Sequence, residues 1–253
     1  MPKIFIAIII AILAFFLFSL FSGNNPSDSS TEQMPTTETQ SEHAEKKKYP
    51  TIVLDAGHGG FDPGKVGVNG ALEKDINLSI VKKLQTLLEE EGFTVHLTRE
   101  SDQLLGPANS TAKKKDDMIA RIDFITKIHP FFTISIHQNS FTSPNTSGPQ
   151  VFYYKDSELS ATMAQILQDV MNEYLQPKKK REAQANTNYY LLTRTPTPTV
   201  IVECGFLSNP TEADLLCSDE YQNKVANAVF LGILSYYEAS NSNPPTSTQT
   251  PSE

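Results

Sequence analysis

Tryptophan is absent from the 253 residues of this chain, and cysteine occurs only at Cys204 and Cys217. Two cysteines without a CxxC pair exclude a disulfide-rich scaffold and a structural zinc finger. A Cys204–Cys217 bridge stays open, although two small buried hydrophobic side chains are the simpler interpretation. Positive charge is also scarce, because the formal net charge is −8. We therefore expect no nucleic-acid partner, since such proteins present a basic face.

Two local catalytic motifs are missing as well. No GxSxG occurs, so the chain lacks the nucleophile elbow of a serine hydrolase. No HExxH occurs, so a catalytic metal would have to be held by residues far apart in the sequence. A cysteine hydrolase built on Cys204 and a wall-binding protein without catalytic activity stay open at this point.

A long hydrophobic run is present only at the amino end, where residues 4–21 are apolar except for Ser19. As a helix this run would be about 27 Å long, close to the thickness of the hydrocarbon core of a bilayer. Lys3 precedes it, and no Lys or Arg follows until Lys46. The asymmetry predicts a transmembrane signal anchor or a signal peptide over residues 1–22, with the remainder of the chain exported.

Composition divides the remainder into three parts. Residues 23–48 are rich in Ser, Thr, Glu, Asn and Pro, which predicts a disordered linker because too little apolar surface is available for burial. Residues 239–253 have a similar composition, and we expect a disordered tail there. Residues 49–238 are left as one folded domain.

Strands alternate with helices along this domain. Hydrophobic periodicity predicts strands over residues 51–55, 93–99, 131–137, 150–154, 189–193 and 199–206, and helices over residues 75–91, 114–128, 157–175 and 220–238. This order favours an α/β fold: a twisted, largely parallel or mixed sheet with helices on both faces. In such sheets, functional side chains gather at the carboxyl ends of the strands.

Four side chains at those ends, or close to them, have the chemistry of a metal site. His58 and His137 follow or end predicted strands, and Glu203 lies inside a strand where an unpaired carboxylate is costly to bury. Glu73 stands just before a helix. Two neutral imidazoles and one carboxylate form a common catalytic zinc shell, and a further glutamate can act as general base.

Five short segments occur in an order typical of one family: Leu54–Gly60, Glu73–Asp75, Thr98–Arg99, Ser135–Asn139 and Val202–Asn209. On these segments, residues 51–238 resemble the bacterial zinc-dependent N-acetylmuramoyl-L-alanine amidases of the amidase 3 type. Within that family the chain is most similar to the short sporulation amidases that prepare spore cortex for germination.

The resemblance implies Zn²⁺ ligands at His58, Glu73 and His137, and a catalytic glutamate at Glu203. It implies cleavage of the amide bond between the lactyl group of N-acetylmuramic acid and L-alanine in peptidoglycan, with formation of muramic lactam in spore cortex. A zinc peptidase acting on stem peptides and a vegetative autolysin are the alternatives. Many relatives carry an aliphatic residue where Cys204 stands; alternation turns it away from Glu203, so we expect it to pack rather than react.

Five further residues are candidates for positioning the site or binding the substrate. Asp55 could orient His58 by accepting its other ring proton. Asn139 could hydrogen-bond the substrate or shape the turn, and Arg99, Arg121 and Arg194 are candidates for binding stem-peptide carboxylates, since arginine forms bidentate pairs. The expected partners are a peptidoglycan strand with its stem peptide and the membrane through the N-terminal segment. A requirement for an activator protein stays open.

Overall fold

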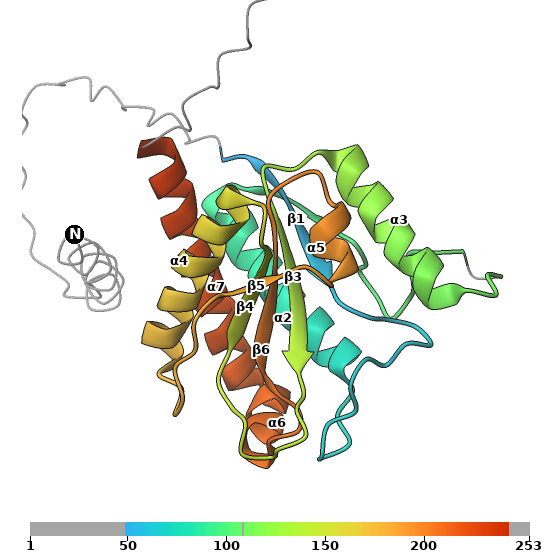
Figure 1. Cartoon of the computed structure of the whole chain (residues 1–253), viewed down its shortest axis with the longest axis vertical. Coiled ribbons are helices and arrows are strands. Elements are labelled where there is room, and N and C mark those ends of the chain that lie inside the picture. The colour runs from blue at the N-terminus through green and yellow to red at the C-terminus, as the bar shows by residue number, and fades with distance from the viewer. Residues whose placement is uncertain (1–48, 108, 243–253) are drawn as a thin grey trace, which may run out of the picture. The chain divides into compact units, whose positions relative to one another are not determined.

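A six-stranded sheet forms the centre of the part of the chain described by the computed structural model, residues 49–107 and 109–242 (Figure 1). The spatial order of the strands is β2-β1-β3-β6-β4-β5. Their bounds are Thr51–Ala56 for β1, Thr94–Leu97 for β2, Thr133–Asn139 for β3, Gln150–Tyr154 for β4, Gln184–Asn186 for β5 and Thr199–Phe206 for β6. Strands β2, β1, β3 and β6 are parallel, and β4 pairs antiparallel with β6. The predicted largely parallel, mixed sheet is confirmed.

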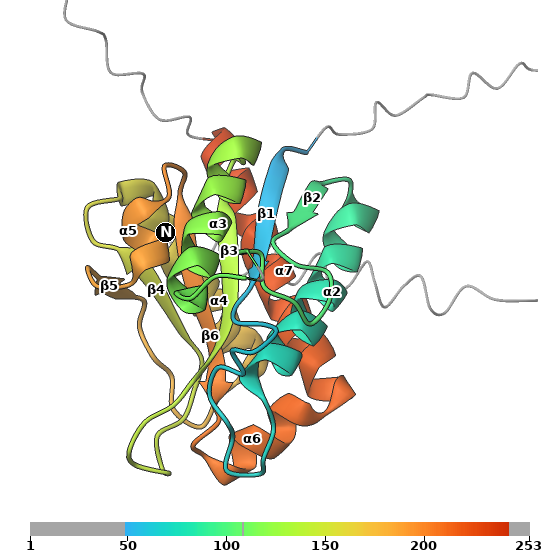
Figure 2. The same cartoon turned by 90° about the vertical axis from the view of Figure 1, so that its right-hand side faces the viewer.

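Helices cover both faces of the sheet (Figures 1 and 2). Their bounds are Glu73–Glu91 for α2, Lys113–Ile128 for α3, Glu158–Leu175 for α4, Tyr190–Arg194 for α5, Pro210–Cys217 for α6 and Asp219–Ser242 for α7. Helices α2, α4 and α7 pack on one face in the largest hydrophobic core. Helices α3 and α5 lie on the other face, over a smaller apolar cluster.

Strict alternation along the central strands gives the two faces different chemistry. Ile52 and Leu54 of β1 enter the core under α2, α4 and α7, whereas Val53 packs with α3 and α5. Since successive side chains of a strand point to opposite faces, Asp55 lies on the α3 side. One face of the sheet is therefore apolar, and the other carries the polar side chains at the carboxyl ends.

Several boundaries differ from the sequence-based predictions. The strand predicted over residues 189–193 is wrong: the side chain of Asn186 accepts hydrogen bonds from the backbone N–H groups of Asn188 and Tyr189, and the chain then turns into helix α5. β5 and α6 were not predicted, although Asn209 caps α6 and Pro210 occupies its first turn. Helix α7 continues to Ser242, beyond the expected domain end at residue 238.

The predictions for residues 1–22, 23–48 and 243–253 lie outside the described residues. Within residues 49–107 and 109–242, no helix combines the length and the apolar character that crossing a membrane requires.

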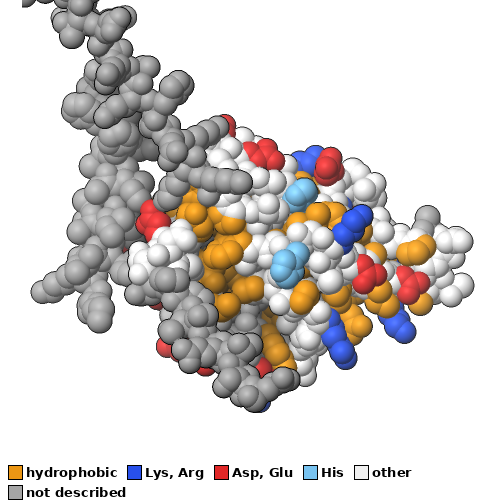
Figure 3. Space-filling model, turned by 90° about the horizontal axis from the view of Figure 1, so that it is seen from above, with side chains coloured by type: hydrophobic (Ala, Val, Ile, Leu, Met, Phe, Trp, Pro, Cys, Tyr) orange, Lys and Arg blue, Asp and Glu red, His pale blue; other side chains and the backbone are white. Residues whose placement is uncertain are grey.

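Aromatic side chains hold together the end of the domain at which β1 begins. The ring of Tyr49 lies 4.4 Å from that of Phe93 and 5.0 Å from that of Tyr237, measured between centroids. Phe131 contacts the rings of Phe132, Tyr236 and Tyr237. Seen from above Figure 1, hydrophobic side chains gather between charges of both signs (Figure 3). The carboxyl ends of the parallel strands point to the opposite end of the domain.

A buried ion pair joins the sheet to α3. Arg121 donates to both Asp55 and Asp117, and its remaining N–H groups reach the carbonyl oxygens of Ala56 and His58. Asp55 also accepts from the hydroxyl groups of Thr98 and Ser135, both at 2.6 Å. Burial alone would raise the pKa of Asp55, but the charge of Arg121 and these two hydrogen bonds lower it to about 2.

Replacing Asp55 by alanine should therefore be strongly destabilising, because it leaves the buried guanidinium of Arg121 under-compensated. We expect a loss of about 3–5 kcal/mol in the free energy of unfolding, measured by urea denaturation of the full chain. The matched control is Lys83→Met, which removes the exposed Lys83–Asp219 pair and should cost less than about 1 kcal/mol. Equal losses for the two variants would contradict this account.

Candidate metal centre

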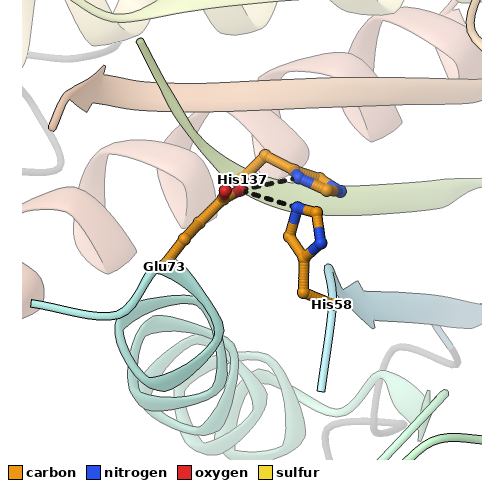
Figure 4. A group of neighbouring side chains, drawn as sticks. All are labelled: His58, Glu73 and His137. Atoms are coloured by element: carbon orange, nitrogen blue, oxygen red, sulfur yellow. Dashed lines mark hydrogen bonds and ion pairs between the residues drawn. The ribbon is translucent and has the colours of Figure 1, made fainter. Parts of the chain in front are cut away.

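A single carboxylate oxygen joins the two predicted histidine ligands. Oε1 of Glu73 lies 3.2 Å from Nε2 of His58 and 2.9 Å from Nδ1 of His137. The two imidazole rings are nearly perpendicular, with centroids 4.9 Å apart. Figure 4 shows the three side chains converging from the end of β1, the start of α2 and strand β3. The fold thus brings together three residues that span 79 positions of the sequence.

A different feature of the local backbone positions each of these three side chains. His58 has a φ of 62°, a left-handed conformation that costs a non-glycine residue about 1 kcal/mol or more. Arg121 donates to its carbonyl oxygen and stabilises this turn. His137 belongs to β3, immediately before a register shift against β6. Glu73 is the first residue of α2, where the helix dipole favours a negative charge.

Two glycines allow the side chains to approach so closely. A Cβ atom on Gly57 would lie 2.2 Å from Nε2 of His137. A Cβ atom on Gly64, whose φ is +69°, would lie 2.6 Å from Oε2 of Glu73 and 2.7 Å from a ring carbon of His58. Any larger residue at either position would push a histidine or the carboxylate out of place, so the glycines shape the site by their lack of a side chain.

Glu73 and His137 shift the pKa values of each other, and His58 contributes to the shift of Glu73. Burial would raise the pKa of Glu73, but hydrogen bonds from His137 and His58 hold it well below its usual range. Burial would lower the pKa of His137, but the hydrogen bond and charge of Glu73 raise it to about 9. A protonated ring of His137 would therefore compensate the carboxylate of Glu73. A divalent cation would displace such a proton, as metals do at histidine sites.

The donor set fits a divalent metal ion. One ligand atom from each of His58, Glu73 and His137 lies within 4.8 Å of the others. Glu73 is fixed further by the backbone N–H groups of Lys65 and Gln138, at 2.7 and 3.1 Å. Two imidazole nitrogens and one carboxylate oxygen, with room for a fourth ligand, form the usual arrangement of catalytic zinc.

Glu203 lies beside this group on the neighbouring strand. It is paired in register with His137, and only 8% of its surface is exposed. Its Oε2 atom is buried and has no hydrogen-bond partner among the described residues. Burial, with a further contribution from the charge of Glu73, raises the pKa of Glu203 to about 7 against the opposing effect of the two histidines. An unpaired carboxylate in this position is poised to exchange a proton with a bound molecule.

Cys204 packs in the hydrophobic core on the opposite face, as predicted. It is 1% exposed, and burial raises the pKa of its thiol far above the usual range. Both cysteines are free, and Cys217 is exposed, so neither a bridge nor a second buried cysteine is present. A thiol in this environment is a poor nucleophile, which argues against the cysteine hydrolase.

The predicted role of Asp55 is wrong. Its carboxylate is occupied by Arg121, Thr98 and Ser135, and the ring nitrogen Nδ1 of His58 instead faces Oδ2 of Asp62 at 3.0 Å. Two backbone hydrogen bonds between Gly59 and Asp62 close the loop that positions Asp62. The sequence signal was its position four residues after His58. We conclude that Asp62 orients His58.

Two of the three arginines proposed to bind substrate are buried and donate their hydrogen bonds to other groups of the protein. Arg99 is 2% exposed and donates to the carbonyl oxygens of Ala56, Gly57, Lys74 and Ser101. Arg121 is equally buried and paired with two carboxylates. The predicted role in binding stem-peptide carboxylates is therefore not supported for either, because both guanidinium groups already hold the loops around the site.

Arg194 and Asn139 are more accessible. Arg194 is exposed and lies over the ring of Tyr190, at 5.6 Å from its centroid. Asn139 is partly buried, and its Oδ1 atom accepts from the backbone N–H of Ser140, so it at least shapes the turn after β3. Both stay predictions as substrate contacts.

A cavity of about 350 Å³ opens over the metal centre on the α3 side of the sheet. Residues from the centre, from α3 and from the α5 region line it, including Asp62, Lys114, Met118, Tyr189, Tyr190 and Glu203. This volume is within the usual range for a binding site of a small molecule or a short segment of polymer. Lys114 and the two tyrosines were not predicted as site residues.

Comparison with known proteins identifies the family of this chain. Residues 52–235 match the family of N-acetylmuramoyl-L-alanine amidases known as amidase 3. The chain belongs to this family. The match extends over all six strands except the first residue of β1, and it includes His58, Glu73, His137 and Glu203.

Relatives within the amidase family support the assignment. The germination-specific N-acetylmuramoyl-L-alanine amidase of Bacillus subtilis is 38% identical over 189 residues, covering 74% of this chain and 79% of its own length. The structure of the CwlD amidase from Clostridioides difficile in complex with the GerS lipoprotein is also 38% identical, with a TM-score of 0.73, over 75% of this chain and 99% of that one. The catalytic domain of the amidase CwlV from Bacillus (Paenibacillus) polymyxa is 27% identical, with a TM-score of 0.66, over 74% and 98% of the two chains.

Replacing Asp62 by asparagine should weaken binding of a divalent metal by this amidase. The amide retains the shape but removes the negative charge that orients His58, and such partners are worth about 10–100-fold in metal affinity. Competition with a chromogenic chelator measures the change. Asp156→Asn, which removes an exposed carboxylate of the loop after β4, is the control. Wild-type affinity in Asp62→Asn would contradict the assigned role.

Proposed function

We propose that this chain is a zinc-dependent hydrolase that cleaves the amide bond between the lactyl group of N-acetylmuramic acid and L-alanine in peptidoglycan. The observation that carries the proposal is the buried, unpaired Oε2 atom of Glu203 beside the His58–Glu73–His137 group. Membership in the amidase family supplies the bond to be cleaved.

His58, Glu73 and His137 would hold the zinc ion. When bound, zinc supplies Lewis-acid chemistry: it polarises the amide carbonyl and makes a water molecule more acidic. Nε2 of His58 and Nδ1 of His137 face Glu73, so these are the nitrogen atoms available as ligands. Asp62 keeps His58 in the tautomer that leaves Nε2 free to bind the ion.

Glu203 would act as the general base and then the general acid. Its carboxylate takes a proton from the attacking water and returns it to the departing nitrogen of L-alanine. The products are the lactyl carboxylate of muramic acid and a free peptide. The raised pKa of Glu203, about 7 without metal, suits a group that must both accept and release a proton near neutrality. A nearby cation would lower this pKa and favour the charged form.

We further propose that the substrate is the peptidoglycan of spore cortex, where removal of the peptide precedes muramic lactam formation. Support comes from the similarity to the germination-specific enzyme of B. subtilis. The C. difficile relative was solved with a lipoprotein, and we propose that this chain also works with an accessory protein.

The same proposal includes an exported location. Residues 1–22 would anchor the chain in the membrane or direct its secretion, and residues 23–48 would form a flexible tether. The catalytic domain would then reach peptidoglycan outside the cytoplasm, as its cell-wall substrate requires.

The test is hydrolysis of purified peptidoglycan by the full chain, with the products identified by mass spectrometry. We expect peptide-free muramic acid ends, and we expect them to vanish with a chelator and return with zinc. Shortened stem peptides still attached to muramic acid would instead assign a zinc peptidase.

Two variants separate the roles of the residues. Glu203→Gln should lower kcat by about 10²–10⁴-fold, because only the proton-transfer group is lost, while metal affinity is retained. His58→Ala should lose both metal affinity and activity. Glu100→Gln, which changes an exposed carboxylate, is the control. A Glu203→Gln variant that hydrolyses at the wild-type rate would exclude Glu203 as the base.

A further inference from the structure

We propose that a groove next to the catalytic cavity, formed by Phe61 and residues 110–115, binds the acidic stem peptide through its carboxylates. This inference rests on the proposed function, since it assigns where one half of that substrate lies. The groove has a volume of about 400 Å³ and is lined by Phe61, Ser110, Thr111, Ala112, Lys113, Lys114 and Lys115.

The groove is continuous with the metal centre. Lys114 lines both cavities, and its Nζ atom lies 2.8 Å from Oδ1 of Asp62, the residue that contacts His58. A substrate with its scissile amide at His58 and His137 can therefore extend one arm along the start of α3. Tyr189 and Tyr190 line the wall of the catalytic cavity that the α5 region contributes. The remaining part of the substrate, the glycan, would lie along this wall.

The charge of the groove is opposite to that of the chain as a whole. Three consecutive lysines occur in a chain whose net charge is −8. Lys113 and Lys115 are exposed and form no ion pair within residues 49–107 and 109–242. The nearby carboxylates are engaged elsewhere: Asp117 bonds Arg121 and two backbone N–H groups, and Asp116 accepts from Ser110. The ammonium groups of Lys113 and Lys115, unlike that of Lys114, are thus available to a ligand.

Phe61 adds an apolar surface beside this charge. Half of its surface is exposed, and Nζ of Lys113 lies 5.3 Å from the centre of its ring. The α3 helix begins in the groove with Ala112 as N-cap, which provides no side-chain cap, so its dipole also favours an anion. A short peptide that carries carboxylates and small apolar side chains matches this combination. A glycan without charge would use neither the lysines nor the helix end.

Binding to the full chain in detergent tests the proposal without requiring catalysis. The probe is a fluorescent L-Ala-D-Glu-diamino acid peptide, compared with the same peptide whose carboxylates are amidated. We expect the wild type to bind the acidic peptide more tightly than the amidated one. Lys113→Gln/Lys115→Gln should raise the Kd for the acidic peptide by about threefold to tenfold, measured by fluorescence anisotropy. The amidated peptide should bind this variant and the wild type equally. Lys114 is left unchanged because it contacts Asp62.

The matched control is Lys178→Gln/Lys180→Gln, which removes the same charge from the exposed basic run after α4. It should bind both peptides as the wild type does. Equal binding of the acidic peptide by Lys113→Gln/Lys115→Gln and wild type would overturn the proposal. An equal loss of affinity for the acidic and the amidated peptide would also overturn it. Binding to vesicles of anionic lipid is measured in parallel: if the variant loses affinity for the vesicles and not for the acidic peptide, the lysines contact a membrane surface and the proposal is overturned.

A kinetic arm separates this inference from the proposed function. With muramyl peptides as substrates, Lys113→Gln/Lys115→Gln should raise KM for the acidic substrate without changing its kcat. Both KM and kcat for the amidated substrate should be unchanged. If the wild type releases no peptide from muramic acid, the proposed function fails, whereas the anisotropy measurements still decide whether the groove binds acidic peptide. A fall in kcat for both substrates, with KM unchanged, would overturn the inference about the groove but would not contradict the proposed amidase function.

Discussion

The carboxylate of Glu73 in contact with both His58 and His137 is the interaction on which the site depends. It joins the end of β1, the first turn of α2 and strand β3 at one point. The neighbouring features accommodate it: Gly57 and Gly64 leave space, Asp62 and Arg121 fix His58, and backbone N–H groups hold the carboxylate. A site so closely supported before a metal is added is pre-organised for one, which is how catalytic geometry is maintained.

The division of the sheet into two faces explains how a polar centre coexists with a stable core. Ile136, next to His137, and Cys204, next to Glu203, point to the opposite face and pack in the core with α2, α4 and α7. The ligand-bearing face is covered only by the shorter layer of α3 and α5, which leaves a cavity over Glu203. Buried charge on this face is tolerated because Asp55 and Arg121 compensate each other.

Periodicity predicted where the candidate site residues lie in the fold. Alternation in β6 separated Glu203 from Cys204, and strand ends located His58 and His137. The mixed sheet also followed from the order of apolar segments. The combination of the four residues, however, was recognised from the family resemblance, since spacing alone does not bring residues 58, 73, 137 and 203 together.

The errors arose where a side chain's partner comes from a distant segment. Asp55 was expected to hydrogen-bond His58, but its carboxylate instead accepts a hydrogen bond from Arg121 of α3, 66 positions away in the sequence. Arg99 and Arg121 were expected to bind the substrate, but their N–H groups donate to backbone carbonyl oxygens such as that of Ala56. Hydrophobic periodicity predicted a strand over residues 189–193, whereas the side chain of Asn186 accepts hydrogen bonds from Asn188 and Tyr189, and helix α5 begins directly after Tyr189.

The most direct test is a crystal structure of the zinc-loaded protein with anomalous data collected at the zinc edge. The account predicts one strong peak bonded to Nε2 of His58, the carboxylate of Glu73 and Nδ1 of His137, with Glu203 adjacent but outside the coordination shell. Zinc bound at another position, or Glu203 acting as a ligand in place of Glu73, would contradict it.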